Sequence, residues 1–255
     1  MKIAIDTEAR RVVVDDAGSA REIPLYSGEA FALLSRIWTN VGWDQKYPYG
    51  FTWFGRPIIQ LPEDIIRIQE TIFRVQPDVI VETGVAHGGS LILYASILKA
   101  MGKGRVVGID VEIRPHNRQA IESHALASMI TLIEGSSTSP DVVARARGQI
   151  VAGERVLVIL DSNHTKAHVA AELLAYSPMV SAGSYIVATD GIMQDLSDVP
   201  RGKPEWRNDN PAAAAREFAA RDSRFVLESV PFLFDETLAR IQVTHWPDAY
   251  LKRIE

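Results

Sequence analysis

One segment decides the fold of this chain: VIVETGVAHGGS, residues 79–90. It starts as an uninterrupted apolar run, which is typical of a strand buried on both faces. It then passes through a glycine-rich turn into an apolar stretch, 90–100, that predicts a helix. Glycines in such a turn let the backbone bend sharply and approach a ligand closely. Strand, glycine turn and helix in this order predict an α/β domain with a ligand at the turn.

The same alternation continues along the rest of the chain. Buried-type strands are predicted at 105–109, 130–133, 156–160 and 185–188, and the last two at 225–227 and 240–243. Helical segments separate them. Apolar strands that alternate with helices predict one mostly parallel, seven-stranded sheet with helices on both faces.

The N-terminal quarter has a different pattern. Apolar runs at 3–5 and 12–14 predict a β-hairpin, helical spacing follows from 28 to about 39, and the aromatic-rich stretch 43–54 predicts an ordered loop. We therefore divide the chain into 1–60, a hairpin, helix and aromatic loop packed on the core, and 61–255, the main domain of a single structural unit. The polar segment 195–211 has the length and makeup of an active-site flap.

Composition narrows the class of protein. The 255 residues suit one large domain, and 47% hydrophobic with 23% charged residues is ordinary for a globular protein. The net charge of −5 and the lack of a basic stripe argue against a nucleic-acid partner. The absence of cysteine excludes disulfides and thiolate chemistry. No apolar run reaches the roughly 18 residues of a membrane span, and no signal peptide opens the chain, so we expect a cytoplasmic protein.

Acidic residues stand at four predicted strand ends: Glu82, Asp110, Asp161 and Asp190. Parallel sheets of this kind bind ligands at the carboxyl ends of their strands, near the point where strand order switches. We therefore expect these four side chains to share one site.

The glycine turn and Asp110 indicate the type of ligand. The spacing is Gly-x-x-x-Gly-Gly and not the Gly-x-Gly-x-x-Gly of dinucleotide-binding domains. Glu82, just before the first glycine, would repel a pyrophosphate but suits the ammonium and sulfonium of S-adenosylmethionine (SAM). Asp110 suits ribose hydroxyls, in NAD as well as in SAM. A plain glycine turn and a loop-opening aspartate are the alternatives.

Asp161 and Asp190 predict a metal site. Neighbouring strand ends bring the two carboxylates close, and they repel unless one is protonated or a cation lies between them. Oxygen ligands favour Mg²⁺ or another hard cation; two exposed turn aspartates are the alternative. His164 is a candidate general base because imidazole titrates near neutral pH. His87 and His245 are weaker candidates.

Four motifs together resemble the cephalosporin hydroxylase/rhamnosyl O-methyltransferase family, a group of class I SAM-dependent methyltransferases. The motifs are WFGRPIIQ at 53–60, VETGVAHGGS at 81–90, GIDVEIRPHN at 108–117 and LDSNHT at 160–165. The resemblance covers roughly residues 40 to 250. It implies a Rossmann-like class I methyltransferase sheet, SAM as methyl donor and Mg²⁺ at the acceptor site.

The resemblance also implies roles for individual residues. It matches Asp161 and Asp190 to metal-binding positions, and we expect Asp161 and His164 to carry the catalysis. Relatives carry two consecutive acidic residues where this chain has Thr189-Asp190, so Asn163, His164 or water are possible replacement ligands. The SAM site is assigned to Glu82, Gly84, Ser90, Asp110 and Ser136.

The motif VATDGIMQD at 187–195 looks most like the branch that methylates rhamnose or related deoxysugars of glycolipids and antibiotics. We expect O-methylation of a sugar hydroxyl on a small glycosylated substrate in natural-product biosynthesis, by a homo-oligomer. A hydroxylated β-lactam or a macrolide as acceptor is the nearest alternative. More distant ones are an NAD-dependent oxidoreductase, against which the glycine spacing counts, and a non-catalytic partner subunit.

Overall fold

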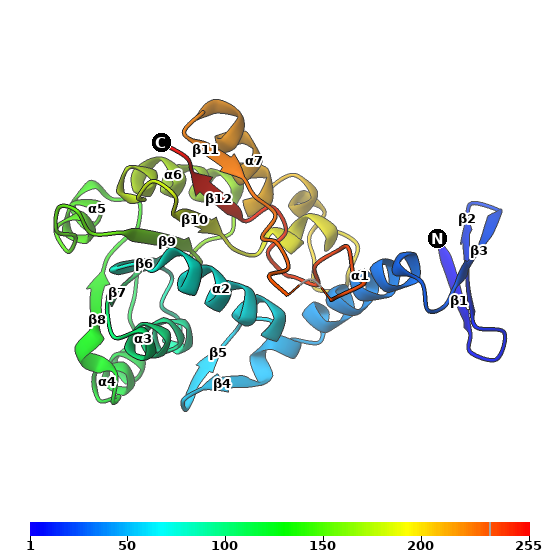
Figure 1. The fold of residues 1–255 in the computed structure, drawn as a ribbon, viewed down its shortest axis with the longest axis horizontal. Coiled ribbons are helices and arrows are strands. Elements are labelled where there is room, and N and C mark those ends of the chain that lie inside the picture. Colours follow the sequence, from blue (N-terminus) through cyan, green and yellow to red (C-terminus); the bar gives the residue numbers. More distant parts are fainter. Residues whose placement is uncertain (235) are drawn as a thin grey trace.

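The computed structural model describes residues 1–234 and 236–255, and a seven-stranded sheet forms its centre (Figure 1). The strand order is β11-β12-β10-β9-β6-β7-β8, and all pairs are parallel except those that β12 makes with its two neighbours. The predicted seven-stranded, mostly parallel sheet is thereby confirmed. Its strands are β6 (Val79–Thr83), β7 (Arg105–Asp110), β8 (Ile130–Glu134), β9 (Val156–Leu160), β10 (Tyr185–Ala188), β11 (Phe225–Leu227) and β12 (Tyr250–Arg253).

The switch in strand order falls between β6 and β9. The chain enters the sheet at β6, adds β7 and β8 on one side, and then returns to add β9 and β10 on the other. Thr83 of β6 is level with Leu160 of β9, and Asp110 of β7 is level with Glu134 of β8. The acidic strand ends therefore lie along one edge of the sheet, where open α/β sheets bind ligands.

Alternating side chains of the strands build two cores. Ile80 packs in the core under the helices on one face, whereas its neighbours Val79 and Val81 pack in the core on the other. This alternation follows from the two-residue period of a strand. The first face carries α2 (Pro62–Val75), α3 (Gly89–Met101) and α4 (Pro115–Glu122), and the second carries α5 (Pro140–Arg147), α6 (Lys166–Tyr176) and α7 (Pro211–Arg221).

The last strand corrects a prediction. Residues 240–243 are not a strand, and β12 is formed by Tyr250–Arg253 instead. Tyr250 and Leu251 are buried between β10 and β11, while Lys252 extends to an ion pair with Glu228. Two basic residues in a four-residue strand hide its apolar character from a reading of the sequence.

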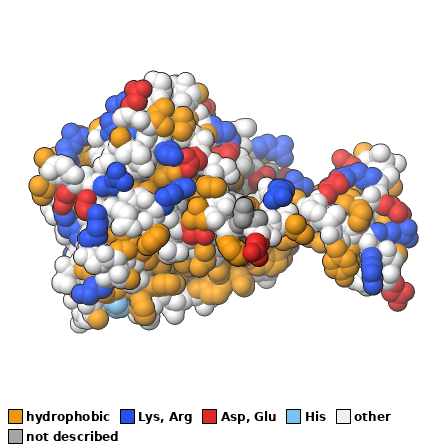
Figure 2. Space-filling model, in the orientation of Figure 1, with side chains coloured by type: hydrophobic (Ala, Val, Ile, Leu, Met, Phe, Trp, Pro, Cys, Tyr) orange, Lys and Arg blue, Asp and Glu red, His pale blue; other side chains and the backbone are white. Residues whose placement is uncertain are grey.

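The N-terminal region is more regular than predicted. The hairpin of β1 (Lys2–Asp6) and β2 (Arg11–Asp16) gains a third strand, β3 (Ser19–Pro24), whose polar sequence buries only Ile23. Figures 1 and 2 show this small sheet as a separate lobe at the start of α1 (Gly28–Asp44). Its core consists of Val12, Val14, Ile23 and Ala30.

The aromatic stretch is also more ordered than an irregular loop. Helix α1 extends to Asp44, a 3₁₀ turn η1 (Tyr47–Gly50) follows, and β4 (Phe51–Trp53) pairs with β5 (Arg56–Ile58). The hairpin turns at Phe54 and Gly55, which both have positive φ. Trp53 donates from its indole nitrogen to the Ser96 hydroxyl at 3.0 Å, so the hairpin packs on α3.

The segment 195–211 begins where the 3₁₀ turn η4 (Gly191–Asp195) ends, contains a second such turn, η5 (Pro204–Arg207), and lies on the end of α1. Arg201 donates to the carbonyls of Trp43 and Asp44, and the Trp206 ring stands edge-on to Trp43 at 5.5 Å. Within the described part of the chain, no helix has both the length and the apolar character needed to cross a bilayer.

Candidate functional site

The turn between β6 and α3 depends on two glycines that other chain segments press against. A Cβ on Gly84, which has φ +93°, would lie 1.9 Å from the carbonyl oxygen of Asp161. A Cβ on Gly89 would lie 2.1 Å from the carbonyl oxygen of Pro57. The turn is therefore in backbone contact with the loop after β9 on one side and with β5 on the other.

Two side chains hold the outer carbonyls of this turn. Arg56 donates to the carbonyl oxygen of His87 from Nε at 3.0 Å and from Nη2 at 2.6 Å. Asn117 donates to the carbonyl oxygen of Ala86 at 2.9 Å and accepts from Arg56 at 3.0 Å. Both residues lie in motifs that the sequence analysis quoted, but their positioning role was missed because it depends on contacts between distant segments.

Asp110 lies beside the turn, as predicted. Its Oδ2 accepts from the backbone N–H groups of Val85 and Ala86 at 2.8 and 3.1 Å. Ser136 lies in the next turn, beyond β8, where its hydroxyl is 3.2 Å from that of Thr138. The N–H of Gly135 donates to the Asp110 carbonyl at 2.8 Å, which places the Ser136 turn at the end of β7.

Glu82 is fully buried beneath the turn. Its Oε2 accepts from the Ser90 hydroxyl at 2.7 Å, whereas Oε1 has no partner among the described residues. Burial, and next the charge of Asp161, raise the pKa of Glu82 well above its ordinary value. Ionising this buried carboxyl group is costly, and a cation close to it would stabilise its charged form.

Asp161, His164 and Asp190 come together as a possible metal site. Each offers one ligand atom, and these atoms all lie within 4.8 Å of one another. His164 Nε2 is 3.4 Å from Asp190 Oδ2. Burial, and then the charge of Asp190, raise the pKa of Asp161 to about 7. Two carboxylates and an imidazole suit a divalent cation, and its charge would remove the cause of their repulsion.

Thr189 completes this cluster in a way that the sequence did not indicate. It is fully buried and its hydroxyl lies 2.8 Å from Asp161 Oδ1, to which it donates. The position therefore orients one carboxylate of the cluster through a neutral hydrogen bond.

One cavity of about 210 Å³ joins the glycine turn to this cluster. From the turn it is lined by Gly84, Gly89 and Ser90, and from the cluster by Asp161, His164 and Asp190. The wall also includes Tyr49 of the aromatic stretch and Gln60. Of the residues predicted to bind SAM, Glu82, Asp110 and Ser136 are not among the lining residues.

The two weaker histidine candidates lie in different surroundings. His87 lines the cavity. His245 is 4% exposed, and burial lowers its pKa; its backbone N–H donates to Asp64 at 2.8 Å. His164 alone of the three is in the acidic cluster.

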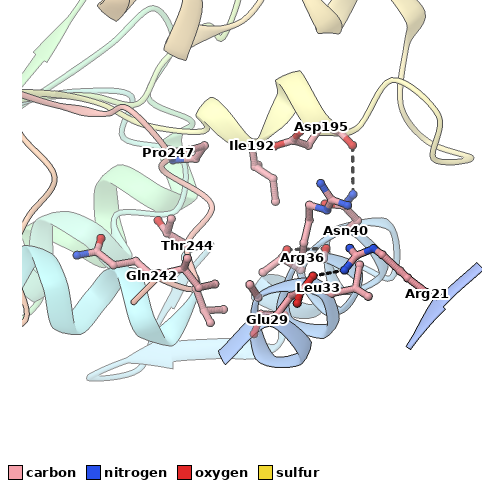
Figure 3. Close-up of a pocket in the computed structure, with 15 residues that line it drawn as sticks. Arg21, Glu29, Leu33, Arg36, Asn40, Ile192, Asp195, Gln242, Thr244 and Pro247 are labelled. Carbon is pink, nitrogen blue, oxygen red and sulfur yellow. Dashed lines mark hydrogen bonds and ion pairs between the residues drawn. The ribbon is translucent and has the colours of Figure 1, made fainter. Parts of the chain in front are cut away.

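A larger cavity of about 440 Å³ lies between α1, η4 and residues 241–244. Figure 3 shows Asn40 reaching across it to the carbonyl oxygen of Asp195, at 3.2 Å, and Arg21 paired with Glu29. None of the predicted site residues lines it. The groups able to carry chemistry are gathered around the smaller cavity.

Known proteins resemble this chain in sequence and in fold. The sequence model of the family described as Rhamnosyl O-methyltransferase/CmcI matches residues 45–254. The rhamnosyl O-methyltransferase of Mycobacterium leprae (strain TN) is 26% identical over 154 residues, which cover 59% of this chain and 64% of that protein. That of Mycobacterium bovis (strain BCG / Pasteur 1173P2) is 30% identical over 132 residues, 50% of this chain and 51% of that protein. The chain thus spans between half and two thirds of the length of these curated relatives.

Among solved structures, a CmcI structure described as containing Mg and SAM aligns with a TM-score of 0.53 and 19% identity. The alignment covers 81% of this chain and 78% of that one. This likeness concerns the fold, and it confirms the predicted class I methyltransferase architecture. The family resemblance stated from the four sequence motifs is confirmed by the family match.

Proposed function

This chain belongs to the rhamnosyl O-methyltransferase/CmcI family, and on that premise we propose that it is a SAM- and Mg²⁺-dependent O-methyltransferase that acts on a sugar hydroxyl. The observation that carries the proposal is the joining of two sites in one cavity. The glycine turn and the cluster of Asp161, His164 and Asp190 line the same cavity. A methyl donor and a metal-bound acceptor need this adjacency.

The residues at the turn fit SAM. Gly84 and Gly89 let the turn pack against the backbone of Asp161 and Pro57. The same turn lines the cavity, where Ser90 presents its hydroxyl, and Asp110 lies beside the turn. Glu82, beneath the turn, supplies a buried acceptor that has no partner among the described residues. These acidic surroundings favour a cation over a pyrophosphate, which also counts against a nicotinamide dinucleotide.

The cluster fits Mg²⁺ or a similar cation. Asp161 and Asp190 would hold it, with His164 close enough to serve as ligand or base. When bound, the metal supplies charge that lowers the pKa of an acceptor hydroxyl and fixes its direction. Because Thr189 offers a hydroxyl in place of a second carboxylate, Asn163, His164 or water would complete the ligand set.

The protein residues then perform two tasks. His164 Nε2 accepts the proton of the acceptor hydroxyl, and the carboxylate of Asp190, 3.4 Å away, stabilises the resulting imidazolium. The rigid turn and the cavity walls hold donor and acceptor in line, which replaces a bimolecular encounter by a positioned one. Tyr49 in the wall shields the reacting groups from water. We propose that segment 195–211, anchored on α1, acts as a flap that closes over the acceptor.

The acceptor is a rhamnosyl or related deoxysugar of a glycolipid or an antibiotic. Support comes from the two mycobacterial relatives, which are rhamnosyl O-methyltransferases by name.

We further propose that residues 61–255 form the catalytic domain, that residues 1–60 are its N-terminal extension, and that the chain acts as a homo-oligomer in the cytoplasm.

Calorimetric titration tests the proposal. SAM and, separately, NADH are titrated into metal-free protein, and the titrations are repeated with Mg²⁺ and a rhamnosyl glycoside. We expect SAM to bind without metal and the glycoside to bind only with it. Asp161→Ala should abolish methyl transfer and leave SAM affinity unchanged. Binding of NADH in place of SAM contradicts the proposal, and full turnover by Asp161→Ala contradicts the role of the metal site.

A further inference from the structure

Gln60 is a buried amide in the wall of the cavity, between β5 and α2. It is 4% exposed and lines the cavity together with Ser90 and Asp161. Its Nε2 donates to the hydroxyl oxygen of Tyr94 at 3.4 Å. The amide therefore lies in the wall that joins the glycine turn to the cluster of Asp161, His164 and Asp190.

The other end of the amide has no partner. Gln60 Oε1 is buried and accepts no hydrogen bond from the described residues. Leaving a buried carbonyl oxygen unpaired costs about 1–3 kcal/mol. In the orientation that the structure has, the NH₂ group donates to the Tyr94 hydroxyl and the oxygen is the end left over. The unpaired end is thus an acceptor.

A second unpaired acceptor lies nearby. Glu82 Oε1 is also buried without a partner among the described residues. Ser90, whose hydroxyl donates to Glu82 Oε2, lines the cavity together with Gln60. Asp161 adds further negative charge to the same region. Two unpaired acceptors in acidic surroundings call for a ligand group with several N–H donors and a positive charge. An ammonium has three donors and no acceptor.

We propose that Gln60 binds the cofactor, and that its Oε1 accepts a hydrogen bond from the α-ammonium of SAM while its Nε2 continues to donate to the Tyr94 hydroxyl. The inference rests on the proposed function. It assigns Gln60 a direct contact with the amino-acid part of the cofactor, and no contact with its adenosine part.

The test compares three ligands by calorimetry: SAM, decarboxylated SAM, which keeps the amine, and 5′-methylthioadenosine, which lacks the whole amino-acid part. In Gln60→Met, which keeps the side-chain volume but removes both polar ends, we expect SAM and decarboxylated SAM to bind at least tenfold more weakly. Affinity for methylthioadenosine should stay within twofold of wild type. Gln119→Met, on the exposed face of α4, is the matched control and should change none of the three affinities.

The outcomes separate the possible failures. Unchanged SAM affinity in Gln60→Met overturns the inference, and so does an equal loss for SAM and methylthioadenosine, which shows a merely structural role. If Gln60→Met does not fold, Gln60→Asn, which withdraws the amide by one methylene, is expected to show the same selective loss. Wild-type protein that binds no SAM overturns the proposed function itself, and with it the inference.

Discussion

Gly84 and Asp161 are in such close contact that no side chain fits between them: a Cβ on Gly84 would lie 1.9 Å from the Asp161 carbonyl oxygen and 2.5 Å from its carbonyl carbon. The N–H of Asp161 is in turn bonded to the carbonyl of Thr83 at 2.8 Å. The glycine turn and the metal loop are therefore one packed unit, although they are far apart in the sequence. A disturbance of one is transmitted to the other.

Substitution of Gly84 tests this coupling. Gly84→Ala meets backbone atoms and also requires a positive φ, so we expect the free energy of unfolding to fall by about 2–4 kcal/mol. The Gly84→Ala protein that does fold should bind both SAM and Mg²⁺ more weakly than wild type. Gly28→Ala is the control, because nothing lies within 4 Å of its added Cβ and it begins α1, where alanine favours the helix. Urea denaturation measures the free energy of unfolding, and calorimetry measures the two affinities. A Gly84→Ala protein that is as stable as Gly28→Ala would contradict the coupling.

Thr189 allows a sharper test of the metal site. Thr189→Val removes the hydroxyl that donates to Asp161 and preserves the shape of the buried side chain. Loss of this hydrogen bond raises the pKa of Asp161 further, so more of the carboxyl group is protonated at pH 7 and cannot bind a cation. We expect Mg²⁺ affinity at pH 7 to fall about three- to tenfold. Thr189→Ser keeps the hydroxyl and should bind Mg²⁺ as wild type does; equal losses in the two variants would refute this explanation.

The wild-type protein should show the same proton competition in its pH dependence. The pKa of Asp161, raised to about 7 mainly by burial, means that below pH 7 the metal must displace one proton from this group. Mg²⁺ affinity should therefore fall as the pH falls, approaching tenfold per unit, and level off above pH 7. Calorimetry between pH 5.5 and 8.5 measures this, and Asp161→Asn removes the titrating group. An affinity independent of pH over that range is incompatible with Asp161 as a ligand.

The sequence predicted the parts of this site that lie at strand ends. Glu82, Asp110, Asp161 and Asp190 each follow an apolar run, and the parallel arrangement of such runs brings their carboxyl ends to one edge. The positions of these four residues at the carboxyl ends of the strands could therefore be predicted from the pattern of apolar runs.

Contacts between segments that are distant in the sequence could not be predicted in this way. Arg56 reaches the carbonyl of His87 only because β5 lies beside the turn, and Gln60 is a buried amide in a short apolar stretch that could equally have been a surface residue. β12 was misplaced for the opposite reason, since its charged end resembles a surface segment. Residue pattern fixes local structure, while these roles depend on tertiary packing.

Asp64 provides a last prediction, on stability. It is 2% exposed near the start of α2, where its carboxylate accepts from the Thr244 hydroxyl and from the N–H of His245, and thereby holds the loop before β12. Burial outweighs these two hydrogen bonds and raises the pKa of Asp64 from 3.8 to about 7.

The sign of the effect follows from this shift. The pKa of the Asp64 carboxyl group is higher in the folded state than in the unfolded chain. Its contribution to the free energy of unfolding is therefore fully present below the unfolded pKa, near 3.8, and is lost as the pH rises through about 7. The loss is on the order of 4 kcal/mol for a shift of this size. Asp64→Asn cannot ionise, but it can still accept from His245 and donate to Thr244. In urea denaturation with a chelator present, the stability of wild type relative to Asp64→Asn should therefore decrease between pH 4 and pH 8. Asp16→Asn, at the exposed end of β2, is the matched surface control and should follow wild type. A constant difference between wild type and Asp64→Asn over this range would mean that the Asp64 carboxyl group ionises as readily in the folded protein as in the unfolded chain.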